Sequence, residues 1–189
     1  MKQAQAPLVL AAVAAITAAG ASIAVAPDMR GLIGAVLAFT MIAIAVIDAR
    51  RFIIPDELTG AALLIAAFQA WWLRGDADIG ATLIEPVWRG VVMAALFYGI
   101  RVGYRAWRGL DGLGLGDVKL AAAAGALLNW TTLPVVVEMA ALSALGAIAV
   151  MHFGLKRPLR RTTRLPFGLF LAPAIWAGWL IETIFGTLF

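Results

Sequence analysis

The chain has 189 residues, of which 63% are hydrophobic and 14% are charged. This composition excludes an ordinary soluble domain and indicates a polytopic membrane protein. There is no cysteine and only one histidine, His152, which excludes disulfides, thiol catalysis and any multi-histidine metal site. The net charge of +4 does not indicate a nucleic-acid partner, because the cations gather on one side of the predicted membrane segments.

Apolar segments of membrane-spanning length follow one another along the chain, separated by short polar or proline- and glycine-containing stretches. The alanine-rich end of the first segment also permits a cleaved signal peptide, but its length favours a retained helix. The stretch 74–85 is predicted as an acidic loop and 101–116 as a basic, glycine-rich connector. The predicted fold is therefore an all-α bundle of seven spans, the fifth of them short, over 7–26, 31–48, 57–73, 86–104, 117–130, 134–153 and 165–187. The first span, within residues 1–30, precedes a single six-helix membrane domain over 31–189.

The basic residues orient this bundle. If the N-terminus is cytoplasmic, eleven lysines and arginines lie on the cytoplasmic side and two or three on the other, a strong positive-inside bias. Asp48 and Asp117 then both lie at the cytoplasmic ends of their helices. The eleven cations are Lys2, Arg50, Arg51, Arg101, Arg105, Arg108, Lys156, Arg157, Arg160, Arg161 and Arg164.

These two aspartates are the candidate catalytic residues. An ionisable group at membrane depth costs about 3 kcal/mol or more to insert and usually has a function. Two neighbouring carboxyls share one proton, so that the ionised member can activate a water while the neutral member protonates a leaving amide nitrogen. The helix dipole favours charge on Asp117, at a helix N-terminus, and disfavours it on Asp48, at a helix C-terminus. Asp117 is therefore the predicted base and Asp48 the predicted acid.

Three stretches, in order, resemble a known family. Gly114-Leu-Gly116-Asp117, within GLGLGDVKLAAAAGALL, resembles the GxGD motif of membrane aspartyl proteases in its type IV prepilin peptidase form. Asp48 with the following ARRFIIPDELT resembles the first catalytic segment of that family. The stretch RLPFGLFLA at 164–172 resembles its late Pro-Phe-Gly-Pro segment, with Leu169 where proline is usual.

The resemblance implies an aspartic endopeptidase that needs no metal or cofactor and removes the short basic leader of prepilins or pseudopilins at the cytoplasmic face of the bacterial inner membrane. Asp48 and Asp117 carry over as its catalytic pair. Larger relatives also carry Cys-x-x-Cys pairs linked to N-methylation, so a chain without cysteine is expected to have peptidase activity alone. The residues expected to shape the site or bind substrate are Gly114, Gly116, Lys119, Pro55, Asp56, Pro166, Phe167 and Gly168.

Other interpretations remain open. A small transporter could use Asp48 and Asp117 as ion sites, although transporter sites usually lie at the membrane midplane. The protein could also be an inactive assembly scaffold, or could cleave substrates within the bilayer, as presenilin-like GxGD proteases do. The sequence assigns no oligomeric state.

The remaining charged residues have simpler predicted roles. Asp56 is expected to cap the third helix, while Asp56, Glu57 and Asp111 could attract a basic leader. Lys119 is expected to extend to the cytoplasmic surface, away from Asp117. Further predictions are an ion pair between Arg89 and Glu85, one helical turn apart, and interfacial placement or helix–helix hydrogen bonds for Glu138 and Glu182.

Overall fold

The computed structural model describes residues 2–75, 77–109, 112–154 and 166–186. Within these ranges the chain is helical and forms no strand, as the composition and segment lengths predict. Asp111 and the predicted basic loop from Lys156 to Arg164 lie outside the described residues. The elements are α1 (Lys2–Val25), α2 (Met29–Arg51), α3 (Asp56–Leu73), α4 (Ile79–Arg108), α5 (Leu115–Leu127), α6 (Thr132–Ala149), the π-helical turn η1 (Val150–Gly154) and α7 (Gly168–Phe185).

Five of these helices are long and apolar enough to cross a membrane: α1, α2, α4, α6 with its π-helical extension, and α7. The first turn of α3 carries Asp56 and Glu57, which lower its mean hydropathy. α5 has only 13 residues and is therefore about 20 Å long, shorter than the roughly 30 Å hydrocarbon core of a bilayer. The molecule is a polytopic helical bundle in which α5, the helix that carries Asp117, is too short to cross by itself.

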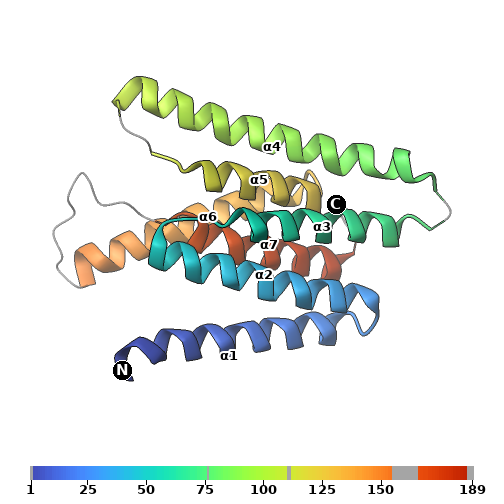
Figure 1. The fold of residues 1–189 in the computed structure, drawn as a ribbon, viewed down its shortest axis with the longest axis horizontal. Coiled ribbons are helices and arrows are strands. Elements are labelled where there is room, and N and C mark those ends of the chain that lie inside the picture. The colour runs from blue at the N-terminus through green and yellow to red at the C-terminus, as the bar shows by residue number, and fades with distance from the viewer. Residues whose placement is uncertain (1, 76, 110–111, 155–165, 187–189) are drawn as a thin grey trace.

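Successive helices run in opposite directions and pack side by side (Figure 1). α1 and α4 lie on opposite sides of the bundle, with α2, α3, α7 and α5 between them (Figure 1). α2 packs against α1, α3 and α7, whereas α5 packs against α3, α4 and α7. The helices that carry Asp48 and Asp117 thus share α3 and α7 as neighbours. Their common core contains the fully buried side chains Leu37, Met41, Ile44, Leu120, Leu171 and Ile175.

α5 approaches α4 closely because a glycine lies at the contact. A Cβ atom added to Gly125 would lie 2.5 Å from the backbone oxygen of Arg89 and 2.8 Å from the nitrogen of Gly90. Backbone atoms cannot rotate out of the way as a flexible side chain can. Small residues at such contacts are a common means of close helix packing in membrane proteins.

The fourth helix is longer at both ends than the predicted span 86–104. It begins at Ile79, because the Asp78 carboxylate caps it by accepting a hydrogen bond from the Ala81 N–H at 3.0 Å. Pro86 therefore lies inside the helix and not at its start. At the other end the helix continues to Arg108 and stops at Gly109, whose φ of 67° is the left-handed conformation common after helix ends. Most of the predicted acidic loop is helical, and so is the first half of the predicted connector.

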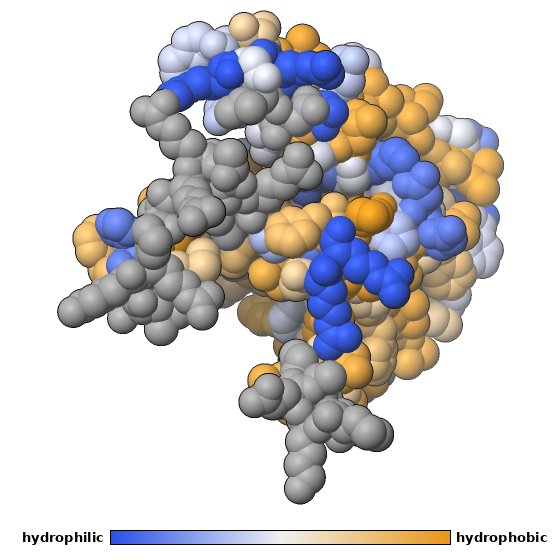
Figure 2. All heavy atoms as spheres, turned by 60° about the vertical axis from the view of Figure 1, so that its left-hand side comes forward, coloured by the Kyte–Doolittle hydropathy of each residue, from blue (hydrophilic) through white to orange (hydrophobic). Residues whose placement is uncertain are grey.

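One end of the bundle is hydrophilic. The C-terminal ends of α2 and α4 and the N-terminal ends of α3, α5 and α7 meet there, at the left in Figure 1. Figure 2 brings this end forward and shows hydrophilic side chains on it, with extensive hydrophobic surface on the body behind. Arg50 and Arg51 end α2, and Arg105 and Arg108 end α4. The flanks expose large apolar side chains on several helices, as expected where lipid surrounds a protein: Leu10, Leu64, Val91, Leu145 and Ile184.

The close contact between α4 and α5 predicts the effect of adding one methyl group. We expect Gly125→Ala to destabilise the protein by about 1–3 kcal/mol, because the added Cβ forces the two backbones apart. The matched change Gly99→Ala lies on α4 with nothing within 4 Å and should stabilise the helix by up to about 1 kcal/mol. Thermal unfolding in detergent micelles measures both, and equal unfolding temperatures for the two variants would contradict the packing argument.

Candidate functional site

Asp48 lies in the last turn of α2, and the chain turns sharply after it. Phe52 adopts a left-handed conformation with φ of 55°, and its N–H donates to the Asp48 backbone oxygen at 2.9 Å. Pro55, with φ of −64°, is the extended residue immediately before α3. The turn places the Asp48 side chain in the interior, where the residue is only 5% exposed.

The Asp48 carboxylate is held by the first turn of α7. Its Oδ2 atom accepts a hydrogen bond from the backbone N–H of Leu169 at 3.0 Å, and the N–H of Gly168 also stabilises it. A Cβ atom added to Gly168 would lie 2.8 Å from the same oxygen. The glycine therefore gives the carboxylate room to reach the amides at the start of α7, where the helix dipole favours negative charge.

Asp117 is held in a similar way within its own helix. It is the third residue of α5, and its Oδ2 accepts a hydrogen bond from the N–H of Gly114 at 3.0 Å. The residue is 8% exposed. The preceding loop is fastened to α4, because the Arg101 guanidinium donates to the backbone oxygen of Leu113.

Ile54 connects the two acidic segments. The Ile54 side chain is buried and touches two glycines. A Cβ atom added to Gly116 would lie 2.9 Å from this side chain, and one added to Gly168 would lie 2.7 Å from it. The residue before Asp117 and the residue before Leu169 thus both pack against this one side chain, which follows Asp48 by six positions. The three sequence stretches singled out above therefore meet at one end of the bundle. Both aspartates are buried at this end, on segments that share Ile54 as a neighbour.

The other predicted site residues lie around this pair. The Lys119 Nζ contacts the Asp56 Oδ1 at 2.6 Å, with side chains 51% and 73% exposed, so Lys119 points to the surface as expected. Asp56 was expected to cap α3, but Pro55 occupies the cap position and Asp56 is the first helical residue. Its carboxylate accepts a hydrogen bond from Lys119 instead.

The segment at 166–168 contributes an aromatic contact between α4 and the start of α7. Phe167 packs against Phe97 of α4, with ring centroids 6.4 Å apart, and Pro166 precedes it at the edge of the described chain. The described part of the chain has no cluster of three or more potential acidic or histidine metal ligands. The chemical groups at this end thus include two buried carboxyls, a surface ion pair, backbone amides and the arginines that end α2 and α4.

Comparison with known proteins identifies the family. The model of the Type IV leader peptidase family matches residues 35–151, more than half of the chain. The chain belongs to the Type IV leader peptidase family. It is 36% identical over 138 residues to the leader peptidase HopD of Escherichia coli, which covers 70% of this chain and 82% of that protein. No solved structure matches.

Longer members of the family are also similar. The prepilin leader peptidase/N-methyltransferase of Aeromonas hydrophila is 31% identical over 162 residues, covering 86% of this chain and 53% of that protein. The corresponding protein of Burkholderia pseudomallei (strain 1026b) is 34% identical over 175 residues, covering 91% of this chain and 52% of that protein. The chain thus spans about half the length of these longer relatives.

Two features of the site were not anticipated from the sequence. Ile54 gave no signal of its own, because nothing in an Ile-Ile-Pro stretch shows that it packs against glycines 62 and 114 positions later. Leu169 stood out only as a departure from the usual proline of the family. The structure gives that departure a consequence, since leucine has a backbone N–H for Asp48 and proline has none.

The Leu169 amide generates a test. We expect Leu169→Pro to lower the activity that depends on Asp48 by about ten- to a hundredfold, because it removes a charge-assisted hydrogen bond of about 1.5–3 kcal/mol and leaves only Gly168 beside the carboxylate. Proline is tolerated in the first turn of a helix, so the bundle should persist. Leu169→Ala keeps the N–H and is the control. Equal activity of the two variants in a membrane cleavage assay would show that this bond does not position Asp48.

Proposed function

We propose that this protein is an aspartic endopeptidase that removes the short basic leader from prepilin or pseudopilin precursors. The observation that supports the proposal is that Asp48 and Asp117 are both buried, are held by backbone amides and lie on segments that pack against Ile54, in a chain of the Type IV leader peptidase family. The relatives named above are leader peptidases, which supports the substrate class. The proposal covers cleavage alone, since these 189 residues contain no cysteine.

The proposed reaction uses the two carboxyls in complementary states. The ionised carboxylate takes a proton from water, and the water oxygen attacks the carbonyl carbon of the scissile peptide bond. The neutral carboxyl gives its proton to the amide nitrogen, and the carbon–nitrogen bond breaks to leave a new carboxyl and a new amine. Backbone amides suit this arrangement, because they position a carboxylate without supplying a full positive charge.

We propose that the reaction takes place at the cytoplasmic face of the inner membrane. Arg50, Arg51, Arg105 and Arg108 all lie at the end of the bundle that carries the aspartates. Positively charged segments of bacterial membrane proteins are retained on the cytoplasmic side. A leader that has not crossed the membrane would reach the site from that side.

The first test is cleavage of a co-expressed prepilin in membranes. We expect Asp48→Asn and Asp117→Asn each to lower the cleavage rate by about 10²–10⁴-fold, the usual contribution of general acid–base catalysis. Glu138→Gln removes an exposed carboxyl from α6 and is the matched control, expected to cleave at the wild-type rate.

The outcomes separate the proposal from its alternatives. Near wild-type cleavage by either aspartate variant would rule out the two-carboxyl mechanism. A wild-type protein that cleaves none of the prepilins offered, but carries protons or cations in vesicles, would favour a transporter.

We further propose that Asp56 receives a basic residue of the leader. Its partner Lys119 is exposed, and exposed ion pairs contribute only about 0–1 kcal/mol, so a leader lysine or arginine can replace Lys119 at little cost. The pair lies beside the aspartates, because Asp56 begins the helix that follows Asp48 and Lys119 follows Asp117 by two positions.

This proposal predicts opposite effects on substrate binding. We expect Asp56→Asn to raise KM by about two- to fivefold, and Lys119→Gln to lower it, with kcat little changed in both. Lys119→Arg keeps the charge and serves as the control. With a precursor whose leader cations are changed to glutamine, the KM differences should disappear. If they persist, Asp56 does not bind the leader.

A further inference from the structure

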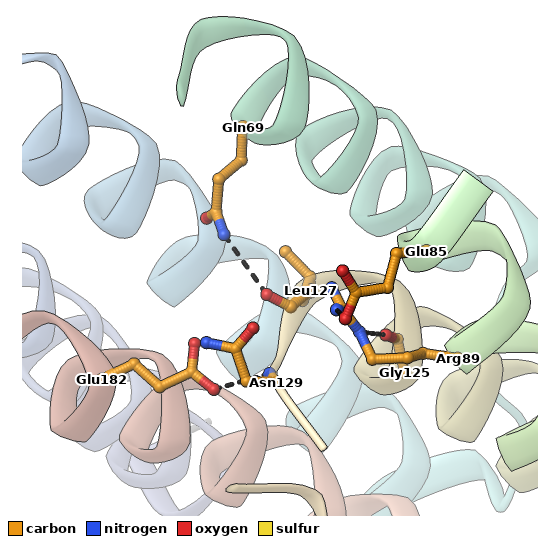
Figure 3. A network of polar contacts seen from close by, with 7 residues as sticks. All are labelled: Gln69, Glu85, Arg89, Gly125, Leu127, Asn129 and Glu182. Carbon is orange, nitrogen blue, oxygen red and sulfur yellow. Dashed lines mark hydrogen bonds and ion pairs between the residues drawn. The ribbon is translucent and has the colours of Figure 1, made fainter. Parts of the chain in front are cut away.

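The end of the bundle opposite the aspartates contains a second polar site. A cavity of about 650 Å³ lies among the ends of α2, α3, α4, α5 and α7. Figure 3 shows polar groups from four of these segments around it. Neither the family comparison nor the proposed peptidase chemistry gives this cavity a role.

A buried arginine is built into the cavity wall. Arg89 is 6% exposed; its Nε donates to the backbone oxygen of Gly125 at 3.1 Å, and its Nη1 contacts the Glu85 carboxylate at 2.7 Å (Figure 3). A buried cation is costly unless it is paired and hydrogen-bonded. Arg30 and Arg74 line the same cavity, and the Arg74 Nη1 also donates to the backbone oxygen of Ala77 at 3.1 Å.

The other polar groups of the cavity are engaged within the protein. The Glu182 carboxylate accepts a hydrogen bond from the Asn129 N–H at 2.6 Å. Gln69 donates to the Leu127 backbone oxygen at 3.2 Å and accepts from the Trp179 indole at 3.0 Å. These bonds fix the wall of the cavity, while the three arginines exceed the two lining glutamates by one charge.

An apolar groove continues from this cavity. It has a volume of about 350 Å³, and its wall comes from α3, α4 and α5. Ala66, Pro86 and Ala126 line both spaces, so the two are adjacent. The groove borders the membrane-facing flank, because Val87 and Val91 on its wall are 60% and 54% exposed.

We propose that the cavity and the groove together bind one phospholipid from the leaflet opposite the aspartates. Arg74 and Arg89 contact the headgroup phosphate, and one acyl chain occupies the groove. Guanidinium groups bind phosphate oxygens through paired, charge-assisted hydrogen bonds. A groove of this volume is too small for a helix about 10 Å wide but has the size of a small-ligand pocket. The joined polar and apolar spaces match a molecule with a charged head and a hydrocarbon tail.

The test measures lipid retained by the purified protein. Native mass spectrometry in mild detergent, with phosphatidylglycerol added to the micelles, should show one retained lipid per chain and a raised unfolding temperature. Diacylglycerol, which lacks the phosphate, and inorganic phosphate, which lacks the tail, should each bind more weakly by about tenfold or more.

Two variants probe the two halves of the site. Arg74→Gln removes a partly exposed headgroup ligand, and Ala67→Phe fills the groove from an exposed position on α3. Each should weaken phosphatidylglycerol retention by about tenfold. Their controls are Arg108→Gln, which like Arg74 has its guanidinium over a tryptophan, and Ala141→Phe, on the exposed face of α6.

The proposal is overturned if both site variants retain lipid as well as their controls do. It is also overturned if inorganic phosphate alone gives the full stabilisation, which would identify a simple anion site. The aspartates take no part in this experiment, so its outcome does not depend on the peptidase proposal.

Discussion

At the aspartate end, a hydrogen bond from the Leu169 amide holds the Asp48 carboxylate in place. It joins the end of α2 to the start of α7 across 121 positions of sequence. Burying a carboxylate is costly, and amides at a helix N-terminus reduce that cost without neutralising the charge. The bond also requires close approach, which the missing side chain of Gly168 permits. Replacing that glycine by any larger residue would push the carboxylate away from the amides that hold it.

The short α5 brings the second carboxyl into the same region. Because α3, α4 and α7 surround it, this helix is largely buried although it is too short to cross a bilayer. Gly116 near its start and Gly125 near its end lie against Ile54 and against the α4 backbone. Glycines thus allow close packing at both ends of the helix that carries Asp117, against the Ile54 side chain at one end and the α4 backbone at the other.

Features that depend on local patterns could be predicted from the sequence. Apolar segments of membrane-spanning length predicted the helices. The spacing of four residues predicted the ion pair between Arg89 and Glu85, which is confirmed at 2.7 Å. Glu182 bonds to the Asn129 backbone, as expected of an acid at a helix–helix contact. Helix ends were less predictable: Pro86 suggested a helix start, but the Asp78 cap begins α4 seven residues earlier. The contacts of Ile54 with two distant glycines leave no local pattern in the sequence. Before the structure, only the family resemblance indicated that these segments belong to one site.

The two polar ends of the bundle differ in how their buried charges are compensated. Arg89 bonds to a carboxylate and a backbone carbonyl, which hold its guanidinium at the wall of the cavity. Asp48 and Asp117 accept hydrogen bonds from backbone amides, and each carboxylate has about four lone-pair directions to fill. Amides fix the orientation of a carboxylate but leave its remaining lone pairs available to water and its proton free to move between partners. An arginine held in this way suits binding an anionic ligand, whereas two oriented carboxyls suit the transfer of protons during hydrolysis. The proposed lipid site and the proposed peptidase site therefore lie at opposite ends of one bundle.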